Sequence, residues 1–367
     1  TDGGFRLKAN GALSDMQAPR RWNVNISVLH ATAAFAQMAC KATGTIWPET
    51  INDKFFVQFK GSAGGNRNDV SMRGQLLSSA GNLTLMAGRH NGNMTAEAYT
   101  KNFNVAGVIN GCDVAGVAAH IKAKGTDMDH MTVNGVVGSI EFKNNKYKNI
   151  RADITTQGTA IRGKIAVNDT RGQINVEGAA DRSPKKPSLN LTAEIRNLYP
   201  AAIGVLTKQA DLAANMNIKA DISGHSLNDI VGNITFTDMA FAFSDEIIVP
   251  GDITITSHDH GKDHNLSLNS NFCQMSLTGQ FNYHSILASM KNIVAKHIQS
   301  LPGTTLTYEK KHSNNFTMCA KISDTRLLRK LTGANFIVDQ PLTIKAMLDD
   351  HNEQVDMKVN LPAFAYN

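Results

Sequence analysis

The chain has 367 residues, of which 42% are hydrophobic and only 6% aromatic, so most apolar positions are aliphatic. Its 37 basic and 31 acidic residues give a formal net charge of +6, and Lys and Arg never occur in runs longer than two. This weak, scattered charge argues against a nucleic-acid-binding protein. No run of 18 apolar residues is present, so we expect no transmembrane helix within this sequence.

Runs that alternate apolar and polar residues fill most of the sequence. Leu189, Leu191 and Ile195 alternate with polar residues, and so do Ile218 and Ile222. A period of two puts the apolar set on one face of a strand and the polar set on the other. Strands are expected, in chain order, at residues 5–13, 22–29, 55–60, 70–77, 83–89, 94–99, 114–122, 132–142, 147–155, 161–167, 173–178, 188–195, 216–222, 231–236, 252–257, 265–271, 274–283, 304–308, 315–322, 341–348 and 353–361.

Turn clusters rich in Gly, Asn and Asp separate these runs, for example at residues 61–68 and 258–263. Gly163, Gly178 and Gly279 fall inside strand patterns instead. Glycines at such positions usually mark bends or bulges, which a strongly curved sheet would use.

Helical patterns are few. Residues 31–42 and 285–300 have apolar residues at helical spacing, and the second segment is followed by Leu301-Pro302-Gly303 as a stop signal. We interpret its apolar stripe as a helix that packs on a sheet rather than as a membrane anchor. Shorter helical turns are expected at residues 198–206, 226–230 and 324–331.

The number of strands limits the possible architectures. An open sheet rarely exceeds about ten strands before it curls or splits. Two or three β-sandwiches are the alternative, but sandwiches usually carry buried Trp or Tyr and Pro-marked boundaries. The chain has nine Pro, two Trp and no linker-like segment. We therefore expect one continuous all-β sheet with a few short helices over residues 1–367, with sub-units at 1–125, 126–223 and 224–367. Both ends lie within strand patterns, so we expect a portion of a longer protein.

The apolar positions of the clearest strands carry no charge, and together they are the candidate binding residues. From periodicity alone they form either a closed, dry core or an open surface that contacts a ligand. They are Ile161, Ile165, Val167, Ile174, Val176, Leu189, Leu191, Ile195, Met216, Ile218, Ile222, Ile253, Ile255, Leu266, Leu268, Met275 and Leu277.

No Gly-rich phosphate loop, nucleophile elbow or paired-carboxylate constellation is present, so we expect a protein that is not an enzyme and has no cofactor. The best metal-like cluster is at an expected hairpin tip, where polar residues accumulate anyway, and we assign no metal site to it. It comprises His258, Asp259, His260 and His264. A second scattered group, also without ligand spacing, comprises His120, Asp127, Asp129 and His130. Asp238 is interpreted as a solvent-facing residue rather than a general base.

The four cysteines stand far apart without a CxxC pair, at positions 40, 112, 273 and 319. We interpret them as buried small hydrophobic residues. A disulfide also remains possible, because spacing alone cannot establish one.

Several segments, taken in order, resemble one β-rich family. Phe59-Lys60-Gly61 and Gly81-Asn82-Leu83 resemble its "strand, Gly, strand" unit, and Phe103-Asn104-Val105 resembles its "Phe-Asn-Leu" connection. Residues 135–142 with Tyr147-Lys148-Asn149-Ile150 resemble its "Gly-x-Ile … Tyr-x-Asn-Ile" hairpin. Residues 221–232 resemble the recurring turn that begins each of its units. The family is AsmA/TamB, in the type found in the Bacteroidota, and the resemblance covers the middle periplasmic β-rich portion.

The resemblance implies a fold and a function. The fold is a long, U-shaped β-sheet groove, called a β-taco, with an apolar interior. The implied role is phospholipid transport through the periplasm between the inner and outer membranes, in a protein anchored in the inner membrane by a segment absent from this chain. Phospholipid acyl chains would be the cargo, and an outer-membrane BamA/TamA-like barrel would be a partner through a part not in this chain.

Two other interpretations remain at this stage. The chain could be a scaffold or chaperone for outer-membrane protein or autotransporter assembly, with open sheet edges that pair with client strands. It could also be a surface adhesin or a structural β-solenoid with a filled interior.

Overall fold

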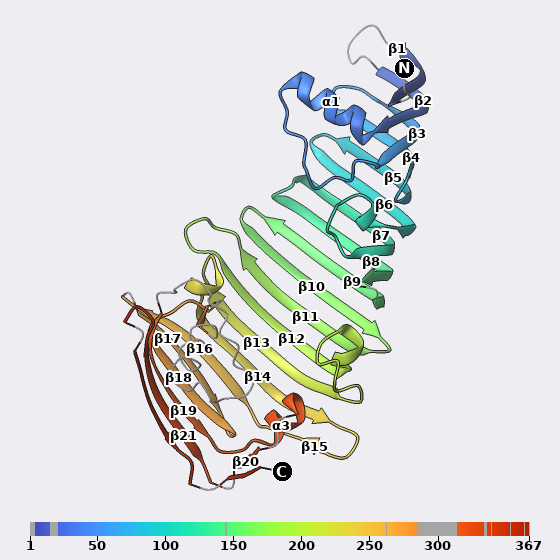
Figure 1. Cartoon of the computed structure of the whole chain (residues 1–367). Coiled ribbons are helices and arrows are strands. Elements are labelled where there is room, and N and C mark those ends of the chain that lie inside the picture. Colours follow the sequence, from blue (N-terminus) through green and yellow to red (C-terminus); the bar gives the residue numbers. More distant parts are fainter. Residues whose placement is uncertain are drawn as a thin grey trace. The chain divides into compact units, whose positions relative to one another are not determined.

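The computed structural model is nearly all β, as the sequence predicts (Figure 1). It describes residues 4–14, 21–143, 145–261, 263–283, 285–286, 314–333, 336–338, 340–352, 354–362 and 364–366. The chain divides into two compact units, Thr1–Asn175 and Val176–Asn367, called unit 1 and unit 2 below. The boundary between them lies inside strand β11 (Gly172–Asp181).

The strands of unit 1 pair in chain order, with α1 (Ala33–Thr43) between β2 and β3 and a short helical segment between β6 and β7. They are β1 (Phe5–Ser14), β2 (Arg21–Thr32), β3 (Phe56–Gly65), β4 (Asp69–Ser78), β5 (Gly81–His90), β6 (Asn93–Phe103), β7 (Val114–Asp127), β8 (His130–Phe142), β9 (Asn145–Gln157) and β10 (Ala160–Asp169).

Unit 2 continues in the same way. Its strands are β12 (Ser188–Leu198), β13 (Ala213–Ser223), β14 (Val231–Ala242), β15 (Ile247–Ile248), β16 (Ile253–His260), β17 (Asp263–Ser270), β18 (Cys273–Gln280), β19 (Asn315–Ile322), β20 (Phe336–Val338), β21 (Leu342–Asp349), β22 (Gln354–Asn360) and β23 (Phe364–Tyr366).

Within the described residues, 21 of the strands form a single sheet, and β20 and β23 form a separate two-stranded one. Each strand from β1 to β10 pairs antiparallel with the next, and the same holds from β12 to β14 and from β16 to β19. The prediction of one large, unclosed sheet with few helices, consistent with a curved groove, is confirmed. The alternative of two or three sandwiches is wrong, because the strands do not divide into facing sheets.

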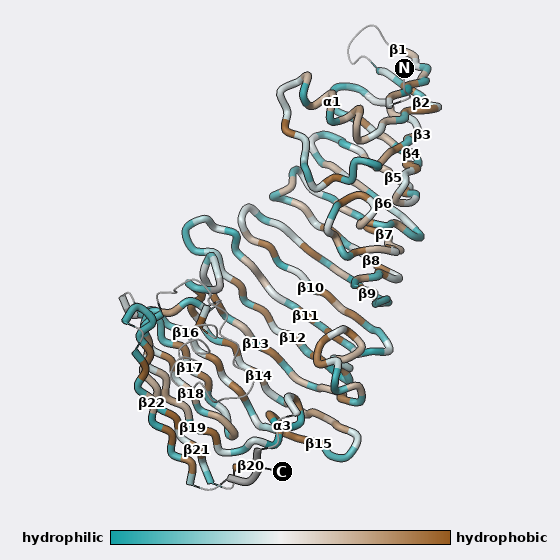
Figure 2. The backbone as a smooth tube through the Cα atoms, viewed as in Figure 1, coloured by the Kyte–Doolittle hydropathy of each residue, from teal (hydrophilic) through white to brown (hydrophobic). Residues whose placement is uncertain are grey.

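The register in unit 1 places apolar residues of successive strands directly opposite one another. One such row crosses nine strands and contains no polar or charged side chain. It consists of Val24, Ala63, Met72, Ala87, Ala96, Ala123, Val133, Ile154 and Gly163. Figure 2 shows the alternation of hydrophobic and hydrophilic residues along these strands.

The register in unit 2 produces an equivalent row. It crosses β12 to β14, β16 to β19, β21 and β22, and it also contains no polar or charged side chain. It consists of Leu191, Ala220, Ile234, Ile255, Leu268, Met275, Ala320, Ile344 and Val359. Since the side-chain period of a strand is two, each row fixes the face of all its neighbours.

The alternation of exposed and half-buried residues changes phase within β9. Asn149 in β9 has φ 55°, and the two neighbouring positions Lys148 and Asn149 are both exposed. The alternation therefore changes phase here, which leaves Tyr147 and Ile150 half-buried and turns Lys148 outward. A residue at positive φ bends the strand locally and re-aims the side chains after it. The phase change thus leaves the Lys148 side chain exposed.

Two bulges lie in β12 and β14, the strands on either side of β13. Asn197 has φ 49° and Asp238 has φ 51°, and the register shifts next to both. The Asn197 backbone N–H donates to the Asn215 side chain (2.7 Å), and the Asn217 amide donates to the Asp238 carboxylate (2.6 Å). Asp238 is exposed, so its side chain caps a bulge at the sheet surface.

Two of the glycines expected to mark bends or bulges lie in strands without a register shift. The register runs unbroken through Gly163 and Gly279. At Gly279, φ is 139°, and a Cβ atom would lie 2.3 Å from the Asn315 carbonyl oxygen. This glycine therefore permits a close strand approach rather than a bulge.

Strand β3 is longer than the sequence predicts. Residues 61–65 were expected in a turn, but they extend the strand and pair with β4. The Phe59 ring lies over two opposed glycines, because a Cβ on Gly61 or Gly74 would come within 2.7 Å of that ring. The ring covers the backbone that the missing side chains leave bare, and Phe59 is itself buried.

The helices agree with the sequence where they are described. α1 (Ala33–Thr43) is capped by the Thr32 hydroxyl and ends at Gly44 in the left-handed conformation. The short helical segments are η1 (Val105–Gly107), η2 (Pro200–Ile203), η3 (Leu227–Asp229) and α3 (Arg326–Thr332). Of these, η1 was not predicted. The expected helix at 285–300, beyond residue 286, and the expected strand at 304–308 lie outside the described residues.

Within unit 2, two contacts join segments that lie several strands apart in the sheet. The Lys330 ammonium of α3 contacts Asp245 (2.6 Å) and Glu246 (3.1 Å), which follow β14, although three strands separate β14 from β19 in the pairing order. The Tyr283 N–H, after β18, donates to the Asn228 side chain before β14 (3.0 Å). At about 4.8 Å per strand, a flat sheet would hold these elements well apart. Unit 2 is therefore curled, and Figure 1 shows β16–β21 turning away from the direction of β12–β14.

Candidate binding face

The registers define two faces in each unit. The face that carries the apolar rows described above is called the apolar face, and the opposite one the polar face. Fourteen of the predicted residues have apolar-face partners in these registers and are not fully buried, and the other three are treated separately below. The fourteen are Ile161, Ile165, Val167, Leu189, Leu191, Ile195, Met216, Ile218, Ile222, Ile253, Ile255, Leu266, Leu268 and Met275.

The remaining three predicted residues differ from these. Ile174 and Val176 share one face of β11 by alternation, and both are half-buried. Leu277 lies on the apolar face of unit 2 opposite Leu266 and Met318, but it is only 5% exposed. Leu277 is therefore covered, whereas the others retain accessible surface.

The apolar faces are only partly covered by the rest of the chain. Thirteen of the fourteen residues with a register partner are half-buried, and Ile165 is 41% exposed. The total accessible surface of the chain is 23354 Å². Two separate compact domains of half its 39.7 kDa mass would together expose about 17000 Å². The predicted residues retain accessible surface, which side chains in a fully closed, dry core would not.

Charged groups on the apolar faces lie near strand ends. Arg89, opposite Val70 and Met94, is one position from the end of β5. In unit 2, Asp259 and His264 oppose each other beside a hairpin tip, with His264 Nδ1 2.5 Å from Asp259 Oδ1. The middle of each face, where the two rows run, stays free of charge.

A short segment covers one end of the apolar face in unit 2. Phe281 packs with the buried Leu277, Phe316 and Leu348, and Tyr283 and Ile286 add to the cluster. The rings of Phe281 and Phe316 lie 6.1 Å apart in an edge-to-face arrangement. We call Phe281, Tyr283 and Ile286 the cap. The sequence analysis placed these residues in a strand and a helix, and it did not identify a cap.

The cap is fixed by buried polar contacts. Asn314 is 1% exposed; its side-chain oxygen accepts from the Asn282 N–H (2.8 Å), and its amide donates to the Ser285 hydroxyl (3.1 Å). The Asp350 N–H donates to the Asn314 carbonyl (2.8 Å). Buried amides need such partners, so these bonds hold the cap against the end of the sheet.

In unit 1, the segment after α1 runs along one set of strand ends. Phe5 of β1 stacks on Phe35 of α1, with ring centroids 4.7 Å apart. Further on, Ile51 bridges to Ile109, and the Asn52 N–H donates to the Val108 carbonyl (2.8 Å). This segment therefore connects the α1 end of unit 1 with the start of β7.

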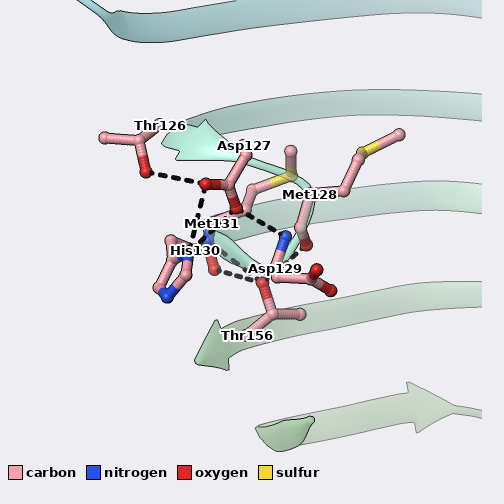
Figure 3. A network of polar contacts seen from close by, with 7 residues as sticks. All are labelled: Thr126, Asp127, Met128, Asp129, His130, Met131 and Thr156. Carbon is pink, nitrogen blue, oxygen red and sulfur yellow. Dashed lines mark hydrogen bonds and ion pairs between the residues drawn. The ribbon is translucent and has the colours of Figure 1, made fainter. Parts of the chain in front are cut away.

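Three residues of the second metal-like group, Asp127, Asp129 and His130, are hydrogen-bonded to one another at a turn. At the β7–β8 hairpin tip, Asp127 accepts from the Asp129 N–H and contacts His130 Nδ1 (both 2.9 Å), and the Thr156 hydroxyl donates to the Met128 carbonyl (Figure 3). The contact with His130 is the main cause that holds the pKa of Asp127 below its usual range. No group of three metal-ligating side chains is found among the residues that the structure describes. The His260 side chain lies outside them.

His120 belongs to a separate contact on the polar face. Its Nε2 atom contacts the Glu97 carboxylate, and Lys122 lies 3.4 Å from the same oxygen. The hydrogen bond from His120 is the main cause that lowers the pKa of Glu97. The pair joins β6 to β7 across the sheet surface.

All four cysteines are free thiols. Cys40, Cys112 and Cys273 are half-buried, and burial raises the pKa of the Cys273 thiol. Cys319 is exposed on the polar face, so the interpretation as a buried small residue is wrong for it.

The chain matches no protein-family model, no curated protein and no solved structure. None of the helices in the described part of the chain is both long and apolar enough to cross a membrane.

Proposed function

We propose that this chain is a segment of an AsmA/TamB-like bridge that shields phospholipid acyl chains as they cross the periplasm between the inner and outer membranes. In this proposal it is anchored in the inner membrane by a segment outside the sequence. An outer-membrane BamA/TamA-like barrel is its partner through another part of the protein. The proposal requires no catalysis and no cofactor. One observation carries it: each unit has an apolar face, crossed by a row of uncharged side chains, that the rest of the chain leaves accessible.

The energetics fit a lipid tail better than a compact polar ligand. Each methylene moved out of water contributes about 0.8 kcal/mol, and that gain needs only apolar contact. A row of Ile, Leu, Met, Val and Ala offers such contact at every strand, with no polar group that would orient a ligand at one place. A tail can therefore move along the face, because no deep site holds it at one position.

The resemblance of sequence order to the AsmA/TamB family supports the same conclusion. The segments that carry it lie in strands of the single sheet and in the connections between them; residues 221–232, for example, run from the end of β13 through η3 into β14. The resemblance implies a long, curved β-sheet with an apolar interior, and an all-β sheet with an accessible apolar face in each unit is consistent with that expectation.

The test is the lipid content of the purified chain. Extraction and mass spectrometry should find phospholipid bound to the wild type and much less bound to Ile218→Asp. Lys219→Asp is the matched control, because Lys219 is the next residue along β13 and lies on the polar face. Absence of phospholipid from the wild type, or equal loss in the two variants, would contradict the proposal.

A second candidate function is scaffolding of outer-membrane protein strands. In the described part of the sheet, β1 pairs only with β2 and β22 only with β21, so each has an edge with backbone groups that another strand could use. All ten residues of β1 are exposed. A photoreactive amino acid at Ala12 should crosslink to a client strand if this function holds, and should give no protein adduct if β1 serves only to extend the lipid surface.

A further inference from the structure

The polar face of unit 2 is hollowed over β18, β19, β21 and β22. The hollow has a volume of about 820 Å³, within the range of small-molecule sites. Three exposed lysines lie in its wall, Lys321, Lys345 and Lys358. The rest of its polar wall consists of uncharged groups that can donate or accept hydrogen bonds, which are Asn269, Gln274, Ser276, Thr343 and Asn360.

The register brings the three ammonium groups together. Lys345 lies directly opposite Lys358, and Lys321 lies opposite Thr343, which places it diagonal to Lys345. Directly opposed side chains have Cβ atoms about 5 Å apart, and diagonal ones about 7–8 Å. Like charges that face each other in this way destabilise a sheet. The arrangement therefore costs stability unless an anion compensates it.

The chain supplies no such anion from its described residues. Among the residues that the structure describes, none of the three lysines has an ion pair, and no Asp or Glu lines the hollow. The nearest carboxylate on this face along β22 is Asp356, two residues before Lys358. A hollow on the polar face of unit 1 differs in having a carboxylate in its wall, since Glu97 lies 3.4 Å from Lys122 there, beside Arg73 and Lys124.

We propose that this hollow binds a ligand with two or more clustered phosphate or carboxylate groups. Lys345 and Lys358 contact one anionic group between them, and Lys321 contacts a second. The neighbouring amide and hydroxyl side chains bind the oxygens that connect the two groups. This site lies on the face opposite to the apolar rows, so it does not depend on the proposed lipid function.

The experiment compares soluble and membrane-held phosphate. Titration calorimetry with tripolyphosphate measures the first, and sedimentation with phosphatidylglycerol vesicles against phosphatidylcholine vesicles measures the second. The double variant Lys345→Gln/Lys358→Gln should bind at least tenfold more weakly than the wild type. Lys219→Gln, on the polar face of β13, is the matched control and should bind normally. Added salt should weaken binding to the wild type, because the site is exposed.

Cys319 provides an independent readout, since it lies opposite Lys345 in the wall of the hollow. In a variant whose other three cysteines are serines, bound tripolyphosphate should slow alkylation of Cys319. Binding of tripolyphosphate alone supports a free anion, and binding of phosphatidylglycerol vesicles alone supports a lipid headgroup. Binding of neither, or equal binding by the double variant and the wild type, overturns the proposal. Circular dichroism of each variant shows whether it is folded.

Discussion

A single carboxylate in the middle of the apolar face should stop lipid tails at that point. Leu268 is the best position, because it lies between Ile255 and Met275 in the apolar row of unit 2 and is half-buried. In Leu268→Asp, a passing tail would have to desolvate an unpaired carboxylate, at a cost of several kcal/mol. Each methylene contributes about 0.8 kcal/mol, so one carboxylate cancels the gain of about five methylenes.

A loss of about 4 kcal/mol corresponds to roughly a thousandfold lower occupancy at that position. The assay is transfer of fluorescent phospholipid between donor and acceptor vesicles in the presence of the full-length protein. Asn269→Asp, the next residue on the polar face, is the control and should transfer lipid at the wild-type rate. Wild-type transfer by folded Leu268→Asp would refute the reasoning, because a tail on this face cannot avoid that row.

Two further predictions concern unit 2. Phe281→Ala should lower the free energy of unfolding by about 3 to 5 kcal/mol, measured by urea titration, because a buried ring is lost. The substitution should also expose Leu277 to labelling. An unchanged urea midpoint would show that the cap does not pack as described. The pKa of His225 is raised above its ordinary value of 6.5, first by the Pro184 carbonyl and then by Asp229. That contribution to stability is complete below pH 6.5 and is lost as the pH rises through the folded-state pKa. Hydrogen exchange at residues 225–229, corrected for its intrinsic pH dependence, should therefore be faster at pH 9 than at pH 6, and equal protection would contradict it.

The strands and their faces could be predicted because both follow from a period of two. Leu189, Leu191 and Ile195 reach the same face as Ile218 and Ile222 without any knowledge of the turns, since each run is regular. The same argument gives the all-β class and the lack of polar side chains along the apolar rows.

What could not be predicted depends on register or on contacts between distant segments. The phase change at Asn149 needs a positive φ that no alternation pattern reveals. The opposition of Lys345 and Lys358 depends on the turn between β21 and β22, because one residue of slip would separate them. The cap is similar: Phe281 and Phe316 are 35 positions apart and meet only after folding.

The extension of β3 beyond its predicted end also depends on a contact that the sequence pattern does not reveal. A run of Gly, Ser and Ala predicts a turn by composition, but residues 61–65 pair fully with β4 because the Phe59 ring covers the bare backbone. Here the contact with the Phe59 ring outweighs the intrinsic preference of these residues for a turn.

The most direct test of the proposed shielding of lipid by the apolar face is photocrosslinking in living cells at two adjacent positions. Leu191 lies in the apolar row of unit 2, and Thr192 is the next residue on the polar face of β12. A photoreactive amino acid at position 191 should give phospholipid adducts, identified by mass spectrometry, and at position 192 it should give none. Protein adducts without lipid at position 191, or equal lipid adducts at both positions, would contradict a face that shields acyl chains.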